Sequence, residues 1–357
     1  MDDILVLDQN FVEQDILDLY YSFLWTERYC GYGDFEIYTP MNFTLYQLLR
    51  EDYYLKIKDS DNLMIIEKRH IKSDSENGDQ LIVTGRSLES ILDRRIVWEQ
   101  TILSGDFQTN LAVLLLDNAI DALIPERNIS LLDYELSEDP RILELDIEKQ
   151  ITGTNLYTVI KSICESIDMG FKITRNSSNQ FIFKFYYGED RSYDQILNPW
   201  VIFSKKFDNI VNSDYIFDKR PFKTVSLVLG AGEGSERKGA IAAISTGAGS
   251  DLNRREMHTD AREISEEYDG LPIPEQDYLA QLVQKGNEDL KQNDIYDVFE
   301  GEVQSAGSFV YGKDFWLGDI VQVENEYGDA GKARVEEIIR SKSPAGSFIY
   351  PTFKTVE

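Results

Sequence analysis

The sequence predicts an α+β protein that is mainly β. Two small β-barrel-like domains are expected to flank an α+β domain, and an acidic helix and loop insert is expected to interrupt the second barrel. Three observations lead to this fold class. Short apolar runs separated by turn residues fill 1–105 and return in 196–357. Helical periodicity is concentrated in 106–195. A strongly acidic stretch with a helical apolar face lies within about 230–300.

Length, charge and cysteine content narrow the classes of function. With 357 residues, of which 42% are hydrophobic, the chain is long enough for two or three domains with real cores. Its net charge of −28 argues against specific nucleic-acid binding, which needs a basic surface, and against binding to an anionic membrane. No run reaches the roughly 18 apolar residues of a membrane span, so no membrane insertion is expected. Cys30 and Cys164 lie far apart and lack a metal-binding spacing.

Residues 1–105 are predicted to form the first barrel-like domain. Its apolar runs are short, and Gly31, Gly33 and Gly78 mark turns between them. Asn42 is placed to cap one inserted helix over 43–49. The predicted strands are 4–7, 20–25, 35–38, 53–58, 63–70 and 80–84.

Residues 106–195 are predicted to form the α+β domain. One helix carries apolar residues at helical spacing over 111–119 and ends before Pro125. Thr154 is placed to cap a second helix, whose apolar face covers 156–167. The predicted strands are 142–147, 171–174 and 181–187, of which the last two form a hairpin.

Residues 196–357 are predicted to form the second barrel-like domain, with the insert at about 230–300. Within it, 251–300 carries 14 acidic and 5 basic residues, which is typical of a solvated helix and loop. The helix of the insert is expected to start near Pro274. The predicted strands are 200–204, 214–217, 223–229, 240–245, 297–304, 320–325 and 333–341.

The stretch 81–98 is predicted to be a structural joint between the first two domains. Gly85 follows a strand and offers a turn, and Ser87 can cap a short helix. The apolar side chains that follow at helical spacing are expected to be buried, and one of the two arginines after them is expected to face a carboxylate. Elsewhere, Arg86 and Arg191 are predicted salt-bridge partners. The residues assigned to the joint are Gly85, Ser87, Leu88, Ile91, Leu92, Arg94 and Arg95.

No residues are predicted to be catalytic, to bind a cofactor or to bind a metal. Gly230 and Gly232 follow an apolar strand, but Ser235 takes the third glycine position of a dinucleotide-binding motif. A second strand follows, so a hairpin is expected there. The G-x-x-x-x-G-K match that ends at Lys313 has Asp314 where a hydroxyl residue should bind magnesium. The chain's 64 carboxylates leave a glycosidase-type pair open, although no pair is singled out.

Five stretches, taken in their order and spacing, carry a resemblance that spans most of the chain. They are GRSLESILDRRIVW (85–98), FIFKFYYGEDRS (181–192), KTVSLVLGAGEGSERKGA (223–240), DLNRREMHTDAREI (251–264) and FWLGDIVQVENEYGDAGKARVEEI (315–338). Together they resemble the tail-hub, or tail-associated, proteins of long non-contractile-tailed bacteriophages (siphoviruses). The fold of that family is similar to the baseplate hub of contractile phages.

This resemblance implies a minor structural protein of the virion, located at the tail tip as a homotrimer and made and assembled in the bacterial host cytoplasm. Its implied partners are further copies of itself, the distal tail protein, the tail tube and tape measure proteins, and receptor-binding or tail-fibre proteins. DNA is expected only in transit, and no cofactor is expected. The acidic composition fits the lining of a channel that passes DNA without binding it, because like charges repel.

We therefore expect a non-enzymatic tail-tip hub that joins the tail tube and distal tail ring to receptor-binding parts and gates DNA ejection. The insert at about 230–300 is the candidate for a mobile plug or docking arm. An alternative is a tail-associated cell-wall or polysaccharide hydrolase that uses an unidentified carboxylate pair. Another is a carbohydrate-binding module unrelated to phages, which would be a monomer with an exposed aromatic strip.

Overall fold

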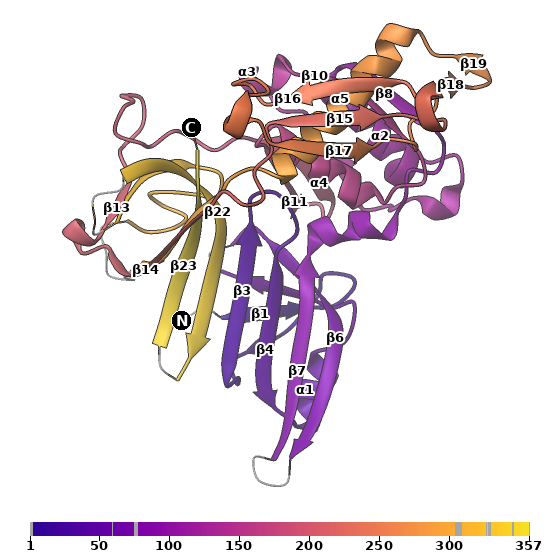
Figure 1. Ribbon diagram of the computed structural model, residues 1–357. Helices are drawn as coiled ribbons and strands as arrows, with labels where there is room; N and C mark the ends of the chain where they lie inside the picture. Colours follow the sequence, from indigo (N-terminus) through magenta and orange to yellow (C-terminus); the bar gives the residue numbers. More distant parts are fainter. Residues whose placement is uncertain are drawn as a thin grey trace. The chain divides into compact units, whose positions relative to one another are not determined.

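The chain folds into two compact units in the computed structural model (Figure 1). Unit 1 contains Met1–Ser90, Gly170–Ile216 and Asp297–Glu357, and unit 2 contains Ile91–Met169 and Phe217–Tyr296. Each unit is therefore built from segments that lie far apart in the sequence. The three predicted domains, at 1–105, 106–195 and 196–357, remain a prediction for this chain. The residues that the structure describes are 3–58, 60–74, 78–303, 309–325, 327, 330–344 and 346–356.

Unit 1 consists mostly of strands, and the prediction of a mainly β protein is confirmed. Its helical segments are short: α1 (Phe43–Leu48) and the 3-10 turn Lys205–Phe207, with the 3-10 helix Leu88–Arg94 leading the chain onward into unit 2. The strands are β1 (Ile4–Leu7), β2 (Glu13–Leu17), β3 (Ser22–Arg28), β4 (Asp34–Pro40), β5 (Tyr54–Ile57), β6 (Leu63–Asp74), β7 (Gly78–Ser87), β11 (Gly170–Arg175), β12 (Phe181–Tyr186), β13 (Ile202–Ser204), β14 (Ile210–Asp218), β20 (Tyr296–Val303), β21 (Ile320–Glu324), β22 (Ala330–Ser343) and β23 (Gly346–Thr355).

A single 13-stranded sheet connects the first and last parts of the chain. Its path runs β14-β20-β23-β22-β3-β4-β7-β6-β5-β1-β2, and β21 pairs with both β13 and β22 beside this path. The connection is made by β22 and β3, which pair antiparallel from Glu337 opposite Arg28 to Lys342 opposite Phe23. Among the described residues the path ends at β14 and β2 without closing, so no closed barrel is present there.

Two apolar cores stabilise unit 1. The first surrounds the buried Trp25 and Phe35 and takes its side chains from strands β1–β7 and from helix α1 with its C-cap. Side chains on β4 and β7 alternate between buried and partly exposed, as expected for strands with one face on a core. The second core surrounds Phe203 and Phe353, whose ring centroids lie 5.0 Å apart. Burial of each such side chain contributes about 1.5–3 kcal/mol, so both cores are substantial.

Unit 2 contains the longer helices. Helix α5 packs on a small sheet in which β15 forms a hairpin with β16 and pairs in parallel with β17. This confirms the hairpin predicted around Gly230. The helical segments are α2 (Phe107–Leu115), the π-helical turn Leu116–Ile120, the 3-10 turns Pro125–Arg127, Gly234–Glu236 and Asp251–Asn253, α3 (Pro140–Leu143), α4 (Leu156–Ser166) and α5 (Glu275–Gln292). The strands are β8 (Thr101–Asp106), β9 (Leu132–Tyr134), β10 (Asp146–Ile151), β15 (Val225–Leu229), β16 (Gly239–Ala243), β17 (Glu256–Asp260), β18 (Glu267–Tyr268) and β19 (Leu271–Pro272).

Local capping explains where several predicted elements begin. The cap at Asn42 is confirmed, because its side-chain oxygen accepts a hydrogen bond from Leu45 N at 2.8 Å. For α4 the predicted cap Thr154 is wrong: Asn155 Oδ1 accepts the bond from Thr158 N, at 3.1 Å.

The strand predicted over 142–147 is also wrong in its first half. Asp139 caps a helical turn that starts at Pro140, and β10 begins only at Asp146. Seven further strands were not predicted from the sequence: β2, β8, β9, β17, β18, β19 and β23. No helix in the described part of the chain is both long and apolar enough to cross a membrane.

Candidate functional site

A cavity of about 940 Å³ lies within unit 1. Its walls come from the beginning, the middle and the end of the chain, so the folding of this unit is what assembles them. Five of its lining residues define its chemistry: Glu27, Glu89, Arg191, Tyr311 and Asp319. Within the ranges that the structure describes, no cluster of three or more histidine, cysteine, aspartate or glutamate side chains could hold a metal ion.

Glu89 is a buried carboxylate at the start of the stretch that leaves unit 1. Its Oε1 accepts a hydrogen bond from Ile173 N at 2.7 Å, and its other oxygen accepts one from the Ser87 hydroxyl. Ser87 Oγ in turn accepts a bond from Gly33 N at 2.7 Å. Glu89 therefore ties the end of β7 to β11. Desolvation by burial raises the pKa of Glu89 above its ordinary value, although the two hydrogen bonds oppose this rise.

The raised pKa of Glu89 predicts a pH effect on stability. Because the folded state holds this proton more tightly than the unfolded state, the free energy of unfolding should fall as pH rises from the ordinary pKa of 4.5 towards the folded value. Glu89→Gln keeps the acceptor for Ile173 N and removes the titrating proton, while its amide nitrogen can only donate towards Ser87 Oγ. The variant should therefore lose this part of the slope. Urea unfolding from pH 4 to 8 measures the difference between the two proteins. Glu138→Gln, at an exposed site, is the matched control, and an unchanged slope in Glu89→Gln would refute the assignment.

Glu27 is the second buried carboxylate on the cavity. Its oxygens accept hydrogen bonds from Trp25 Nε1 at 3.0 Å and from the Tyr311 hydroxyl at 2.8 Å. Arg340 Nε lies 4.0 Å from it. Burial, together with the negative charge of Glu27, holds the pKa of Tyr311 well above its ordinary value, so this phenol stays protonated and keeps donating. Glu27 thus links β3 to the segment before β21.

Asp319 organises a third wall. Its two oxygens accept hydrogen bonds from Glu189 N at 2.8 Å, Arg191 Nε at 2.7 Å and Trp316 N at 3.0 Å. The Arg191 guanidinium also lies over the Trp316 ring, 5.0 Å from its centroid. Both charged side chains are buried, with exposed fractions of 12% for Arg191 and 3% for Asp319. Gly188 permits this approach, because a Cβ at that position would lie 2.0 Å from the Gly318 carbonyl carbon.

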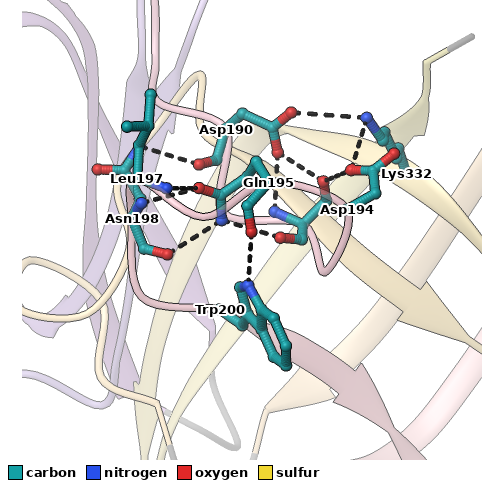
Figure 2. A network of polar contacts seen from close by, with 8 residues as sticks. Asp190, Asp194, Gln195, Leu197, Asn198, Trp200 and Lys332 are labelled. Atoms are coloured by element: carbon teal, nitrogen blue, oxygen red, sulfur yellow. Dashed lines mark hydrogen bonds and ion pairs between the residues drawn. The ribbon is translucent and has the colours of Figure 1, made fainter.

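The loop that follows Arg191, residues 192–200, is held by a dense polar network (Figure 2). Gln195 is at its centre: its Nε2 donates to the carbonyl oxygens of Ser192 and Asn198, and its Oε1 accepts from Leu197 N and Asn198 N, all within 2.8–3.0 Å. Trp200 Nε1 donates to the Gln195 carbonyl oxygen at 2.9 Å. A single glutamine side chain therefore fixes the path of most of the loop.

Charged groups fasten the base of the same loop. Ser192 Oγ lies 2.6 Å from a carboxylate oxygen of each of Asp190 and Asp194. Lys332, on β22, lies 2.9 Å from Asp194 and 3.5 Å from Asp190. The Ser192 hydroxyl, followed by the Lys332 ammonium, lowers the pKa of Asp194, so the carboxylate stays ionised.

A family model, described as the siphovirus ReqiPepy6 Gp37-like protein, matches residues 3–353. The chain belongs to this siphovirus family. The predicted resemblance to a siphovirus family is thereby confirmed. No curated protein matches the chain.

Three crystal structures of tail proteins share the fold of this family member. The prophage MuSo2 43 kDa tail protein from Shewanella oneidensis aligns with a TM-score of 0.60 at 11% identity, covering 99% of this chain and 98% of that one. The tail protein from Neisseria meningitidis MC58 aligns with a TM-score of 0.57 at 13% identity, covering 99% of this chain and 96% of that one. Prophage tail protein gp18 from Listeria monocytogenes EGD-e aligns with a TM-score of 0.53 at 14% identity, covering 99% of this chain and 95% of that one. At such low identity the likeness shows the fold alone.

The predicted joint of this siphovirus protein takes a different local form from the expected one. Gly85 lies inside β7 and not in a turn, because β7 continues to Ser87. Ser87 directly precedes the 3-10 helix, and its hydroxyl contacts Gly33 N and the Glu89 carboxylate, as described above. Leu88, Ile91 and Leu92 are buried and belong to a 3-10 helix.

The predicted arginines divide into two groups. Arg86 forms a two-point ion pair with Glu67, at 2.6 and 2.8 Å, and Arg191 pairs with Asp319. Arg95 donates instead to the carbonyl oxygen of Arg127, at 2.5 Å. The structure records no ion pair to a carboxylate for Arg94 or Arg95 among the described residues. The peptide carbonyls near Arg95 are available acceptors, and they replace the expected carboxylate.

Four residues of the site were not predicted from the sequence: Glu27, Glu89, Gln195 and Asp319. A carboxylate next to apolar residues at helical spacing, as Glu89 is beside Leu88 and Ile91, was the available signal for one of them. Gln195 had no such signal, because its side chain bonds to backbone groups of its own loop. Asp319 had none either, because two of its partners, Glu189 and Arg191, lie far away in the sequence.

Proposed function

We propose that this protein is the homotrimeric hub at the tip of the siphovirus tail. The observation that carries the proposal is the family match over residues 3–353, together with a tail-protein fold that covers nearly the whole chain. The long sheet joined through β3 and β22 supports it, because a hub must transmit load between its parts without local unfolding.

In this proposal the two apolar cores of unit 1 correspond to two barrel-like domains, and trimers of such domains meet the ring of distal tail protein. The segment 81–98 joins the first of them to the rest of the chain. The acidic residues of about 230–300 act as a plug or docking arm. Their negative charge lines the channel and repels DNA, so the DNA does not adhere to the wall as it passes. Ejection then requires only that the contacts between the three subunits open.

The buried carboxylates favour a structural role over the hydrolase alternative. Glu27 and Glu89 both line the cavity, yet each already accepts hydrogen bonds from two protein donors. A general acid or nucleophile must reach substrate, which these contacts oppose. The same contacts join strands that are distant in the sequence, which is the role expected in a load-bearing unit.

Light scattering at several protein concentrations tests the proposal. A hub should show a mass of three times the 41.1 kDa of one chain. A protein that stays monomeric as the concentration rises would contradict it. Assay of sugar or peptide release from host cell wall tests the hydrolase directly, and measurable release would contradict the non-enzymatic role.

A further inference from the structure

The loop 192–200 exposes apolar side chains, and the polar network shown in Figure 2 holds its backbone. Ile196 is 93% exposed and Leu197 is 89% exposed, and Tyr193 and Trp200 are each about half exposed. Apolar side chains this exposed are normally on mobile segments, yet the backbone here is fixed by Gln195, by Asn198 and by the ion pairs of Lys332. These contacts therefore give the loop a defined shape.

Such an arrangement has a cost and a benefit. Exposed aliphatic groups lower solubility, and they gain free energy only when another surface covers them. Because the loop is already ordered, little conformational entropy is lost when a partner binds, and this preorganisation strengthens binding. Ile196 and Leu197, the most exposed, would make the central contacts with a partner. Tyr193 and Trp200, which are about half exposed, would make contacts beside them.

The charge around the loop indicates which partner fits. At the base of the loop, the carboxylates of Glu189, Asp190, Asp194 and Asp319 outnumber the cations of Arg191 and Lys332. A second copy that docked with this same loop would bring the same local excess of negative charge, which opposes association at this surface. An anionic membrane is disfavoured for the same reason. A different protein, with an apolar pocket and a basic rim, complements both the apolar tip and the acidic base.

We propose that the loop 192–200 is a docking prong that inserts Ile196 and Leu197 into an apolar, basic-rimmed pocket of another structural protein of the same tail. This inference rests on the proposed hub function and names the surface through which one subunit holds a neighbouring, non-identical component. In this proposal, the loop takes no part in contacts between copies of the chain.

The test compares two charge-neutral double variants of the full-length protein. I196S/L197S removes the prong, and L123S/L252S removes two equally exposed leucines from unit 2 as the matched control. Each separately purified structural protein of the same tail is immobilised in turn and titrated with the wild type and both variants. One of them should bind the wild type and the control alike and bind I196S/L197S at least tenfold more weakly. Added salt should weaken wild-type binding, because the rim contacts are ionic.

Three results would overturn the proposal. The first is equal binding of I196S/L197S and the wild type to every tail protein tested. The second is loss of self-association in I196S/L197S by light scattering, which would make the loop a contact between copies. The third is binding to phosphatidylcholine vesicles that the variant loses, which would make the loop a membrane contact. A wild type that is monomeric but still binds through the loop would refute the trimeric hub and leave the prong intact.

Discussion

Replacing Asp319 with alanine is expected to lower the free energy of unfolding by about 3–5 kcal/mol, because it leaves the buried Arg191 charge without its partner. The same change removes the acceptor for the backbone N–H groups of Glu189 and Trp316. Those two groups come from segments that are distant in the sequence, so the loss loosens the wall of the cavity and the start of the loop 192–200. Urea unfolding at neutral pH measures the change.

The control for this variant is an ion pair at the surface. Glu256 pairs with Arg254 at 2.6 Å, but both side chains are exposed, so Glu256→Ala should change stability by no more than about 0.5 kcal/mol. The double variant R191A/D319A should be less destabilised than the sum of the two single changes, since it leaves no unpaired charge. Equal losses for D319A and E256A would contradict the assignment of Asp319 as the organising acceptor.

Replacing Gly85 with alanine is expected to cost about 3 kcal/mol, the upper part of the range for overpacking. A Cβ at Gly85 would lie 1.8 Å from the Ile65 carbonyl oxygen and 2.8 Å from Phe35 Cε1. The oxygen belongs to the backbone of β6, which pairs with β7 through a bulge between Ile66 and Lys68. Removing this steric overlap therefore requires β6 and β7 to move apart, which loosens the packing of the first core. Thermal unfolding of the variant measures the loss.

Gly331→Ala is the matched control, since Gly331 also lies in a strand. Its added Cβ would meet nothing closer than Thr355 Cγ2, at an ordinary 3.7 Å. Alanine restricts the unfolded chain more than glycine does, so this variant should be neutral or slightly more stable. If Gly85→Ala were as stable as Gly331→Ala, the close approach of β6 and β7 would be wrong.

Local pattern predicted local structure well in this chain. The alternation of apolar residues placed β1, β4 and β7 within a few residues, and the cap at Asn42 was assigned from its residue type alone. The pairing of β22 with β3 could not be predicted from the sequence, because periodicity indicates a strand but does not identify the strand with which it pairs. The predicted strand over 80–84 also ended three residues before the end of β7. A glycine such as Gly85 usually indicates a turn, and the close approach of β6 that requires a glycine there is not visible in the sequence.

The chemistry of unit 1 was harder to predict than its strands. Arg86 and Arg191 were expected to pair with carboxylates, but the partners Glu67 and Asp319 could not be chosen among 64 acidic residues. The structural role of a buried carboxylate such as Glu27 can be assigned only when its hydrogen-bond donors are known. No prediction was made for Ile196 and Leu197 from the sequence, and only the structure places these apolar side chains in solvent.

Immunoelectron microscopy of intact virions, with an antibody raised against the purified protein, tests the central claim most directly. The tail-tip hub predicts label at the end of the tail that is distal to the capsid, at one position per particle. Label on the capsid or along the tail tube would contradict it. So would virions that carry no label although infected cells contain the protein.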